Sequence, residues 1–584
     1  MASMIKELFE KKVISATDFG IAGFLSRESG SGDPDKRETL ELLAALISMQ
    51  AGTGSSCLTE TAYRRFKEEL KQFSGELSLS FDPESKFPEW KGFQELSCFN
   101  DLYTADPFRE FKPVVFFKDR FYFYKYWLHE KSLAEKLCRL ASESGGHAEE
   151  FDRFSNIFNE LFNAESAEQR AAAELSVKNR MTVITGGPGT GKTTIISKII
   201  LTLLSLYPEE KVLLAAPTGK AASRMNESLR KNLPAGSPSE SITERAVETA
   251  GTLEGCSIHR LLGSGYGKFS FNKNNHLNAD LIIIDEASMV DISIMNALLD
   301  AIDRKTSLIL LGDKDQLASV AVGSVLSDIC ALKQSVFKNN IAELTKAYRF
   351  DPAVREIVEL IKAEDSENLV KRDVFIDTKL SETKQNSSGT KQDIAGIIKE
   401  NYKFLFNADP PSVILEKLNS FKILSTTNES VARINETAEK VFGIDPARDP
   451  WYNGRPVMVT KNNYETGLFN GDCGVILERN GTKRAYFQGH GDHSFAIQEL
   501  GIVETVYAMT IHKSQGSEFK SVLISIPNDI NSSAMLTKEI LYTAVTRAKK
   551  EVSIYASAET IENTLKSSSN RGSGLKDLIS VFGN

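Results

Sequence analysis

Cysteine is scarce in this chain, and no two cysteines stand in the C-x-x-C spacing that metal and redox sites use. That absence excludes a zinc ribbon, an iron–sulfur cluster and a disulfide framework. The six cysteines are Cys57, Cys98, Cys138, Cys256, Cys330 and Cys473. The chemistry of the protein must therefore come from other side chains.

Long hydrophobic runs are also missing. No stretch approaches the roughly 20 apolar residues of a membrane span, and the start, MASMIKELFEKKVISATDF, lacks the apolar core of a signal peptide. We therefore expect no membrane association and a cytoplasmic location. At 584 residues the chain is too long for one hydrophobic core, so about three or four domains are expected.

An excess of positive charge is absent as well, since the formal net charge is −8. Such a balance does not indicate a nucleic-acid binder. It does not exclude one either, because a motor that grips a few phosphates in a channel needs only local basic residues.

One glycine-rich stretch, VITGGPGTGKTT at 183–194, follows the phosphate-loop pattern G-x-x-x-x-G-K-[ST]. A predicted strand precedes it and a predicted helix follows. Glycines let backbone N–H groups surround a phosphate, and a helix N-terminus adds partial positive charge. The predicted nucleotide-binding residues are Gln169, Gly186, Gly187, Pro188, Gly189, Thr190, Gly191, Lys192, Thr193 and Thr194.

The side chains of this stretch predict the roles within the site. Lys192 would reach the β- and γ-phosphates of ATP, and the Thr193 hydroxyl would bind Mg²⁺. Gln169 lies on a predicted helix that leads to the phosphate-loop strand. It could read the adenine edge, or it could be an ordinary solvated helix residue.

Two further buried runs end in polar residues. Leu281–Ile284 predicts a strand that delivers Asp285 and Glu286 to its carboxyl end, where open α/β sheets bind ligands. Asp285 would join Thr193 in the Mg²⁺ shell, and Glu286 would polarise the attacking water. A third predicted strand, 308–311, is followed by Gln316, which could sense the γ-phosphate.

Residues 1–150 predict a mostly helical domain without clustered catalytic residues. Val114–Phe117 and Phe121–Tyr124 predict a hairpin. The aromatic run FYFYKYW at 121–127 is either a partner-binding surface or part of a packed hairpin, and packing is the simpler interpretation. The polar segment 142–152 predicts a linker.

Alternating strands and helices from 153 onwards are typical of an α/β parallel sheet. We expect a first lobe at 153–350, with a small hairpin insert at 264–278 and a surface insertion at 226–256. A second α/β lobe is expected at 351–584. Short strands separated by turn residues predict a small β-barrel inserted at about 454–502. The segment 381–392 is low in apolar residues and is expected to be mobile.

Two arginines could act across the cleft between the lobes. Arg349 and Arg547 are candidate arginine fingers, which would stabilise the transferring phosphoryl group and make hydrolysis depend on lobe closure. Each could also be an ordinary surface ion-pair residue. The residues predicted to contact DNA are Thr218, Lys220, His259, Phe269, Thr510 and His512.

Taken in order, these stretches resemble the motifs of superfamily 1 helicases. The segments that carry the resemblance are GGPGTGKTT, APTGKAASRM, SIHRLLG, IIIDEASMVD, LLGDKDQLASV, LTKAYRF, YAMTIHKSQGSEF and LYTAVTRAKK. The chain is most similar to the RecD family, the alpha subunits of exodeoxyribonuclease V, because GRPVMVTKNNYETGLFNGDCGVI, RGSGLKDLI and LAALISMQAGTGSSCLTE resemble that family too.

The resemblance implies an α/β fold of two RecA-like P-loop lobes, with an SH3-like barrel insert and a helical N-terminal domain. It implies a DNA-dependent ATPase that moves 5′ to 3′ on single-stranded DNA from duplex ends. The hairpin near Phe269 would be a strand-separating pin. Implied partners are the beta subunit, a helicase-nuclease, and the gamma subunit, in double-strand-break repair and recombination.

Other functions remain open. A superfamily 1 RNA helicase would lack the insert that resembles RecD, and a stand-alone helicase would carry a longer N-terminal extension. A scaffold with a decayed ATPase would have lost catalytic residues that are present here. No nuclease activity is expected, because metal-dependent nucleases need several converging carboxylates and the one suggestive E-x-K pair outside the ATP site, Glu518 and Lys520, lies inside a helicase motif.

Overall fold

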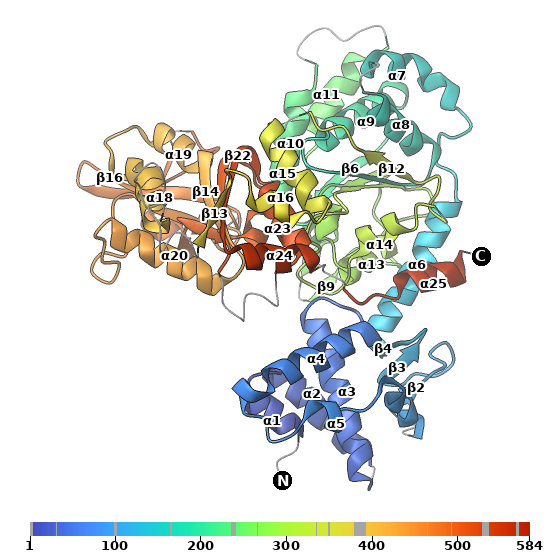
Figure 1. Cartoon of the computed structure of the whole chain (residues 1–584). Helices are drawn as coiled ribbons and strands as arrows, with labels where there is room; N and C mark the ends of the chain where they lie inside the picture. Colours follow the sequence, from blue (N-terminus) through green and yellow to red (C-terminus); the bar gives the residue numbers. More distant parts are fainter. Residues whose placement is uncertain are drawn as a thin grey trace.

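The computed structural model describes residues 4–30, 32–98, 102–163, 166–234, 241–265, 267–334, 336–348, 351–378, 393–463, 465–491, 493–527, 536–567 and 571–583. Arg349 and the segment 381–392 lie outside the described residues. The chain folds into a helical N-terminal part and two α/β lobes that lie side by side (Figure 1).

The N-terminal part is mostly helical, as predicted, with a small four-stranded sheet in the order β1-β4-β3-β2. Its strands are β1 Leu58–Thr59, β2 Tyr103–Thr104, β3 Val114–Phe117 and β4 Arg120–Phe123. Its helices are α1 Met4–Glu10, α2 Ala16–Glu28, α3 Pro34–Gly52, α4 Glu60–Leu77, α5 Pro83–Lys86 and the 3₁₀-helix η1 Trp90–Cys98.

The predicted hairpin exists, with its turn at Lys118 and Asp119. Both residues adopt the left-handed conformation that a tight hairpin turn needs. Three residues of the aromatic run at 121–127 are packed inward, since Phe121 and Tyr122 are fully buried and Trp127 nearly so. The structure thus supports the packed-hairpin interpretation for these three residues, while Lys125 is exposed and the other three are half-buried.

The first lobe contains a six-stranded parallel sheet in the order β12-β5-β11-β10-β6-β7. Its strands are β5 Met181–Gly186, β6 Val212–Ala216, β7 Cys256–Ser257, β10 Leu281–Ile284, β11 Ser307–Gly312 and β12 Ile341–Leu344. Its helices are α7 Ser155–Leu161, α8 Ala167–Lys178, α9 Lys192–Leu206, α10 Gly219–Asn232, α11 Glu244–Thr252, α12 Ile258–Leu261, α13 Ile292–Asp300 and α14 Val325–Ala331, with 3₁₀-helices η2 Phe151–Phe154 and η4 Ala287–Met289.

Separate apolar clusters cover the two faces of this sheet. Helices α7 to α11 supply one cluster, in which Ala246 and Ala250 of α11 are fully buried. The segment 226–256 is thus partly core rather than a surface insertion, because α11 packs against α9. A short hairpin lies inside the range 264–278, with β8 Ser264–Gly265 paired with β9 Lys268–Phe269.

The other face is covered by α13, α14 and two helices from distant parts of the sequence. These are α6 Tyr124–Ser142 and α25 Leu575–Phe582, which lie side by side (Figure 1). Their packing joins both helices to the core of the first lobe. The sequence-based division places α6 in the N-terminal domain and α25 in the second lobe.

The second lobe contains a five-stranded parallel sheet in the order β13-β22-β21-β14-β20. Its strands are β13 Phe375–Asp377, β14 Phe421–Ser425, β20 Ala508–Thr510, β21 Phe519–Ser525 and β22 Ala548–Ala556. Its helices are α15 Pro352–Lys362, α16 Ser366–Val370, α18 Ile394–Tyr402, α19 Pro411–Ser420, α20 Asn428–Val441, α21 Ile511–Ser514, α23 Lys538–Val545 and α24 Ala558–Lys566, with the 3₁₀-helix η5 Lys403–Phe406.

An antiparallel five-stranded sheet is inserted between β14 and β20, in the order β18-β17-β16-β15-β19. Its elements are β15 Arg455–Val459, β16 Cys473–Arg479, β17 Thr482–Phe487, β18 Ser494–Ala496, the 3₁₀-helix η6 Ile497–Glu499 and β19 Val503–Thr505. It has its own small apolar core, which includes Val457, Ile476 and Phe487. We call it the insert.

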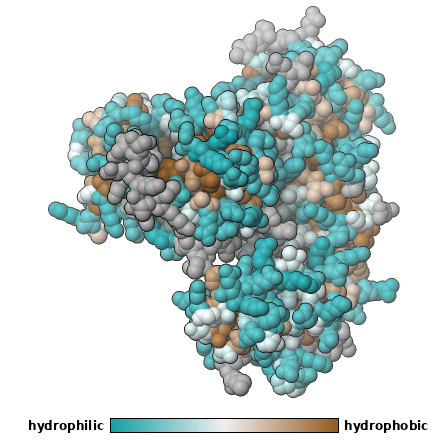
Figure 2. All heavy atoms as spheres, viewed as in Figure 1, coloured by the Kyte–Doolittle hydropathy of each residue, from teal (hydrophilic) through white to brown (hydrophobic). Residues whose placement is uncertain are grey.

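The face of the molecule shown in Figure 2 is mostly hydrophilic, and apolar side chains are gathered in separate patches on it. Among the described residues, no helix is both long enough and apolar enough to cross a membrane.

Candidate nucleotide site and nucleic-acid interface

The phosphate loop lies between β5 and α9. Every residue of β5 is buried, because the strand sits between β11 and β12 in the sheet. The loop residues Gly189 and Gly191 have φ of +78° and +86°, a conformation that favours glycine. Helix α9 begins at Lys192, so its N-terminus points into the loop as an anion site requires.

The ammonium group of Lys192 lies at the mouth of this loop. Its Nζ donates to the carbonyl oxygens of Gly186 at 2.6 Å and Gly187 at 3.0 Å. The Thr190 hydroxyl also donates to the Gly187 carbonyl, at 2.8 Å. A phosphate in the loop would therefore meet a positioned positive charge.

Gln169 supports the loop from behind. Its side chain is buried, and its Nε2 donates to the Thr190 carbonyl at 3.1 Å. Position 191 favours glycine because its φ is +86°, and a Cβ there would also lie 2.3 Å from the same nitrogen. The interpretation of Gln169 as a solvated helix residue is wrong, because the side chain fills the space beneath the loop.

Asp285 and Glu286 follow β10 at the carboxyl edge of the sheet, as predicted. Burial, and next the charge of Glu286, raise the pKa of Asp285 to about 7, while the Lys192 charge opposes the shift. The backbone N–H of Glu286 donates to Asp285 Oδ1 at 2.8 Å. Glu286 has φ of +53°, a strained conformation that sets the direction of its side chain.

The residues present fit a Mg²⁺ ion. The Thr193 hydroxyl and the Asp285 carboxylate are hard oxygen donors, and a cation would offset the cost of ionising a buried carboxyl group. Within the described ranges, no three His, Cys, Asp or Glu side chains form a metal cage. Mg²⁺ commonly takes further ligands from substrate phosphates and water.

Gln316 follows β11 and lies at the contact between the lobes. Its Nε2 donates to Asp313 Oδ2 at 3.1 Å, and Tyr542 of the second lobe donates to the same oxygen at 2.9 Å. Burial raises the pKa of Asp313. Asp313 and Tyr542 are functional candidates that the sequence analysis did not single out, although both lie inside quoted motifs.

A second bridge between the lobes lies one residue further along. The Leu317 backbone N–H donates to the Thr543 hydroxyl at 2.8 Å, and Gln515 Nε2 donates to the Leu317 carbonyl at 3.1 Å. A cavity of about 450 Å³ opens beside the hydrogen bond between Asp313 and Tyr542. Its walls include Gly187, Thr190, Asp313, Arg355, Lys362 and Tyr542.

Arg547 is buried, with only 3% of its surface exposed, so it is not a surface ion-pair residue. Its Nε donates to the Thr543 carbonyl at 3.1 Å, and its Nη1 to the Ser517 carbonyl at 3.3 Å. It lies near Arg224 of the first lobe, whose pKa is lowered by burial and by the charge of Arg547. The guanidinium is therefore held by its own lobe, close enough to Arg224 of the first lobe for the two charges to interact.

The predicted DNA contacts lie on both lobes. Thr218 caps α10 by accepting from Ala221 N at 3.2 Å, and Thr510 caps α21 by accepting from Lys513 N at the same distance. His259 is exposed, and its ring centroid lies 6.0 Å from that of Phe269.

His512 is half-buried in the second lobe, and its pKa is lowered by burial and by the charge of Arg571. Lys220, which is predicted to contact DNA, already has a partner within the protein. Its Nζ donates to the Gly471 carbonyl of the insert at 2.6 Å, and burial lowers its pKa. Lys220 therefore bonds the first lobe to the insert.

Three family models match the chain. Residues 10–122 match the N-terminal domain of RecBCD enzyme subunit RecD, residues 169–322 match an AAA domain, and residues 505–555 match a UvrD-like helicase C-terminal domain. The matches fall on the N-terminal part, the first lobe and the second lobe.

The chain also resembles whole curated proteins. It is 31% identical to RecBCD enzyme subunit RecD of Mycolicibacterium smegmatis, over 94% of this chain and 95% of that protein. It is 28% identical to the protein of that name from Haemophilus influenzae, over 99% of both. The ATP-dependent RecD2 DNA helicase of Deinococcus radiodurans is 29% identical, over 66% of this chain and 48% of that protein.

These matches span the phosphate loop, both lobes and the N-terminal part described above. The chain belongs to the RecD family of superfamily 1 DNA helicases.

Proposed function

We propose that this protein is the ATP-driven motor subunit of an exodeoxyribonuclease V complex, moving 5′ to 3′ on single-stranded DNA. The observation that best supports motor activity is that Asp313 accepts hydrogen bonds from both Gln316 and Tyr542. It ties a residue beside the phosphate loop to the opposite lobe, so loss of the γ-phosphate can change the relation between the lobes.

Each residue of the site has a proposed part in hydrolysis. Lys192 binds the β- and γ-phosphates, and Thr193 and Asp285 would hold Mg²⁺, which neutralises charge on the phosphates when bound. Glu286 orients the attacking water, Gln316 senses the γ-phosphate, and Arg547 stabilises the transferring group. Arg349 keeps its proposed role as a second arginine finger.

The DNA path is proposed to run across Thr218 and His259 of the first lobe and Thr510 and His512 of the second. The insert, proposed to be an SH3-like barrel, lies beside this path because Lys220 bonds to it. The experiment is a steady-state ATPase assay with and without single-stranded DNA, beside unwinding of duplexes with a 5′ or a 3′ tail. Unwinding only from the 3′ tail would contradict the polarity.

A stand-alone helicase is the second candidate, because the chain also matches the Deinococcus RecD2 helicase. The match to the N-terminal domain of the RecBCD subunit favours the complex. Co-purification from native extract distinguishes the two, since the motor subunit would travel with the beta and gamma subunits.

The pin is tested by deleting Lys268–Asn275 and joining the flanks with a short glycine turn. We expect single-strand-stimulated ATPase to persist while unwinding falls, since the hairpin does not touch the phosphate loop. Lys273→Ala is the matched control, because Lys273 is exposed and lies between the bridged residues Asn272 and Asn275, outside the β8–β9 hairpin. Phe269 packs against the apolar core of the first lobe. Equal loss of ATPase activity and of unwinding would therefore mean that the hairpin has a structural role.

Docking of the partner subunits is proposed for the N-terminal part, where Phe111 is 78% exposed. Phe111→Ser should weaken assembly with the beta and gamma subunits by about tenfold or more, as loss of an aromatic anchor does. Ile502→Ser, at a 56% exposed position on the insert, is the matched control. Complex formation is followed by size-exclusion chromatography, and unchanged assembly would exclude Phe111 from the interface.

The same mixtures test the source of nuclease activity. We expect DNA degradation only when the beta subunit is present, because Glu518 is engaged in an ion pair with Lys549 at 3.2 Å. Degradation by the isolated chain, abolished by Glu518→Gln, would contradict this assignment.

A further inference from the structure

The connection between β11 and α14, residues 313–324, touches three parts of the molecule in turn. It starts beside the phosphate loop with Asp313 and Gln316. Its next residue, Leu317, is bonded to the second lobe through both its N–H and its carbonyl. Any movement between the lobes during ATP turnover must therefore pass into this connection.

The far end of the same connection is bonded to the N-terminal part and to residues near the C-terminus. The Gly323 N–H donates to the Gly54 carbonyl at 2.9 Å. Arg571 Nη1 donates to the Ala321 carbonyl at 3.1 Å and to the Gly323 carbonyl at 3.4 Å. The Ser319 hydroxyl donates to the Ala321 carbonyl at 2.9 Å and braces the loop from within.

We call residues 571–574, with the sequence RGSG, the strap. It runs against the N-terminal part, where Ser56 N donates to the Gly572 carbonyl at 2.9 Å and Gly572 N donates to Ser55 Oγ at 3.2 Å. A Cβ at Gly572 would lie 2.5 Å from the Cys57 carbonyl oxygen. The two backbones approach too closely for any side chain there.

The strap is also fixed to the first lobe. Glu130 of α6 is buried, and its carboxylate accepts from Ser573 Oγ at 3.0 Å and from Gly574 N at 3.0 and 3.2 Å. The Ser56 hydroxyl donates to the same carboxylate. One buried carboxylate thus bonds α6, the strap and the N-terminal part together.

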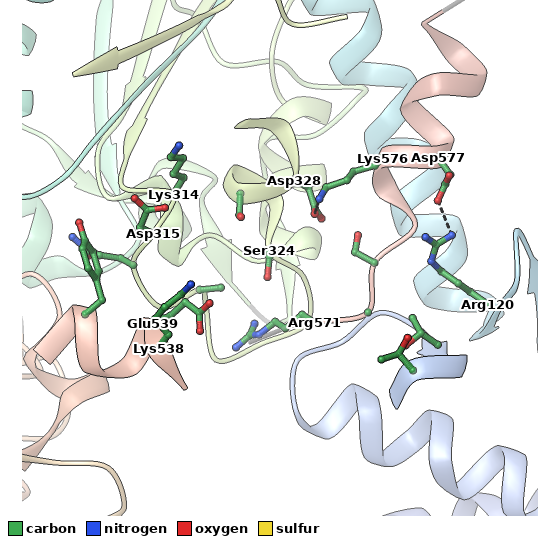
Figure 3. Close-up of a pocket in the computed structure, with 18 of the residues that line it drawn as sticks. Arg120, Lys314, Asp315, Ser324, Asp328, Lys538, Glu539, Arg571, Lys576 and Asp577 are labelled. Carbon is green, nitrogen blue, oxygen red and sulfur yellow. Dashed lines mark ion pairs between the residues drawn. The ribbon is translucent and has the colours of Figure 1, made fainter. Parts of the chain in front are cut away.

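Figure 3 shows the surroundings of the strap, which borders a cavity of about 1030 Å³. Arg571 extends along this cavity toward Lys538 and Glu539 of the second lobe, while Arg120 and Asp577 form an ion pair at 2.6 Å on the opposite side. The strap therefore lies where the N-terminal part and both lobes meet.

We infer that the strap couples the N-terminal part to the ATP site, with Arg571 as the positioning residue of the 317–323 loop. A guanidinium suits this position because it can donate to two carbonyls at once. Gly54 completes the arrangement, since it has φ of +89° and a Cβ there would lie 2.6 Å from the guanidinium carbon. Where it is tested through enzyme activity, this inference rests on the proposed function, because it assumes a DNA-stimulated ATPase.

The first test compares Arg571→Ala, Arg571→Lys and Gly54→Ala with wild type. Arg571→Ala should lower the DNA-stimulated kcat about tenfold, the scale expected for lost bonds from a charged donor. Nucleotide affinity and the unstimulated rate should stay unchanged. Arg571→Lys should recover part of the rate because one bond can remain. Gly54→Ala should reproduce the loss, and the double variant should be no worse than either single one.

Lys576→Ala is the matched control, because Lys576 lies two residues beyond the strap and pairs with Asp328 at 3.8 Å. We expect it to behave as wild type. Melting curves identify any variant that fails to fold. A stimulated rate in Arg571→Ala equal to that of wild type would overturn the inference.

The second test does not depend on DNA. A nonhydrolysable ATP analogue should change amide hydrogen exchange at Gly323 and Ser56 in wild type, but not at Ser56 in Arg571→Ala. If wild type shows this change but no DNA stimulation, the proposed function fails and the coupling stands. If the analogue changes Ser56 equally in both proteins, or in neither, the coupling is wrong.

Discussion

Lys192→Ala is expected to lower ATP turnover by several orders of magnitude, about a thousandfold or more. The substitution removes the positive charge that stabilises the transferring phosphoryl group. The structure places its ammonium 2.6 Å from the Gly186 carbonyl, at the mouth of the phosphate loop. No other described lysine donates to this loop. Alanine leaves the glycine backbone in place but removes the charge that a phosphate would meet.

Steady-state ATPase assays beside thermal melting measure this effect. Lys198→Ala is the matched control, because Lys198 lies on the same helix and stacks its ammonium on the Phe162 ring at 4.5 Å. It should keep most of the turnover. If Lys192→Ala retained more than about a tenth of wild-type turnover and had a normal melting curve, the catalytic role assigned to Lys192 would be wrong. That rate would be far above what loss of the stabilising charge allows.

Arg547→Ala should remove the DNA-stimulated part of ATP hydrolysis, about a thousandfold in the limiting case of an arginine finger. Nucleotide binding should be spared, because the bonds of Arg547 run to Thr543 and Ser517 of its own lobe. The guanidinium would act on the phosphate only once DNA has closed the cleft.

Fluorescent-nucleotide titration beside the ATPase assay separates the two roles. Lys549→Ala, two residues further on, removes an exposed cation paired with Glu518 and serves as the control. Collapse of nucleotide affinity together with turnover in Arg547→Ala would place Arg547 in ground-state binding instead.

The sequence allowed the strands of the ATP site to be predicted because they are short, apolar and buried on both faces. Leu281–Ile284 is confirmed residue for residue, and the run 308–311 lies within β11 Ser307–Gly312. Polar residues after such strands must lie at one edge of the sheet. Asp285 and Gln316 could therefore be placed without knowledge of any side-chain contact.

Contacts between distant residues could not be predicted. Lys220 and Gly471 are separated by 251 positions, and Cys138 of α6 and Ile579 of α25 by 441. Neither pair leaves a periodic signal in the sequence. The burial of Gln169 was missed for a similar reason, because its partner, the Thr190 carbonyl, belongs to a loop whose path depends on the whole fold.

The packing of α25 has a consequence for synthesis of the protein on the ribosome. Leu575, Leu578 and Ile579 of α25, which packs against α6 and α14, join the core of the first lobe, yet they are translated hundreds of residues after the rest of that core. Their burial contributes on the order of 5 kcal/mol, comparable with the net stability of a domain. The nascent first lobe therefore keeps an apolar face open to chaperones until residues 575–579 have been translated.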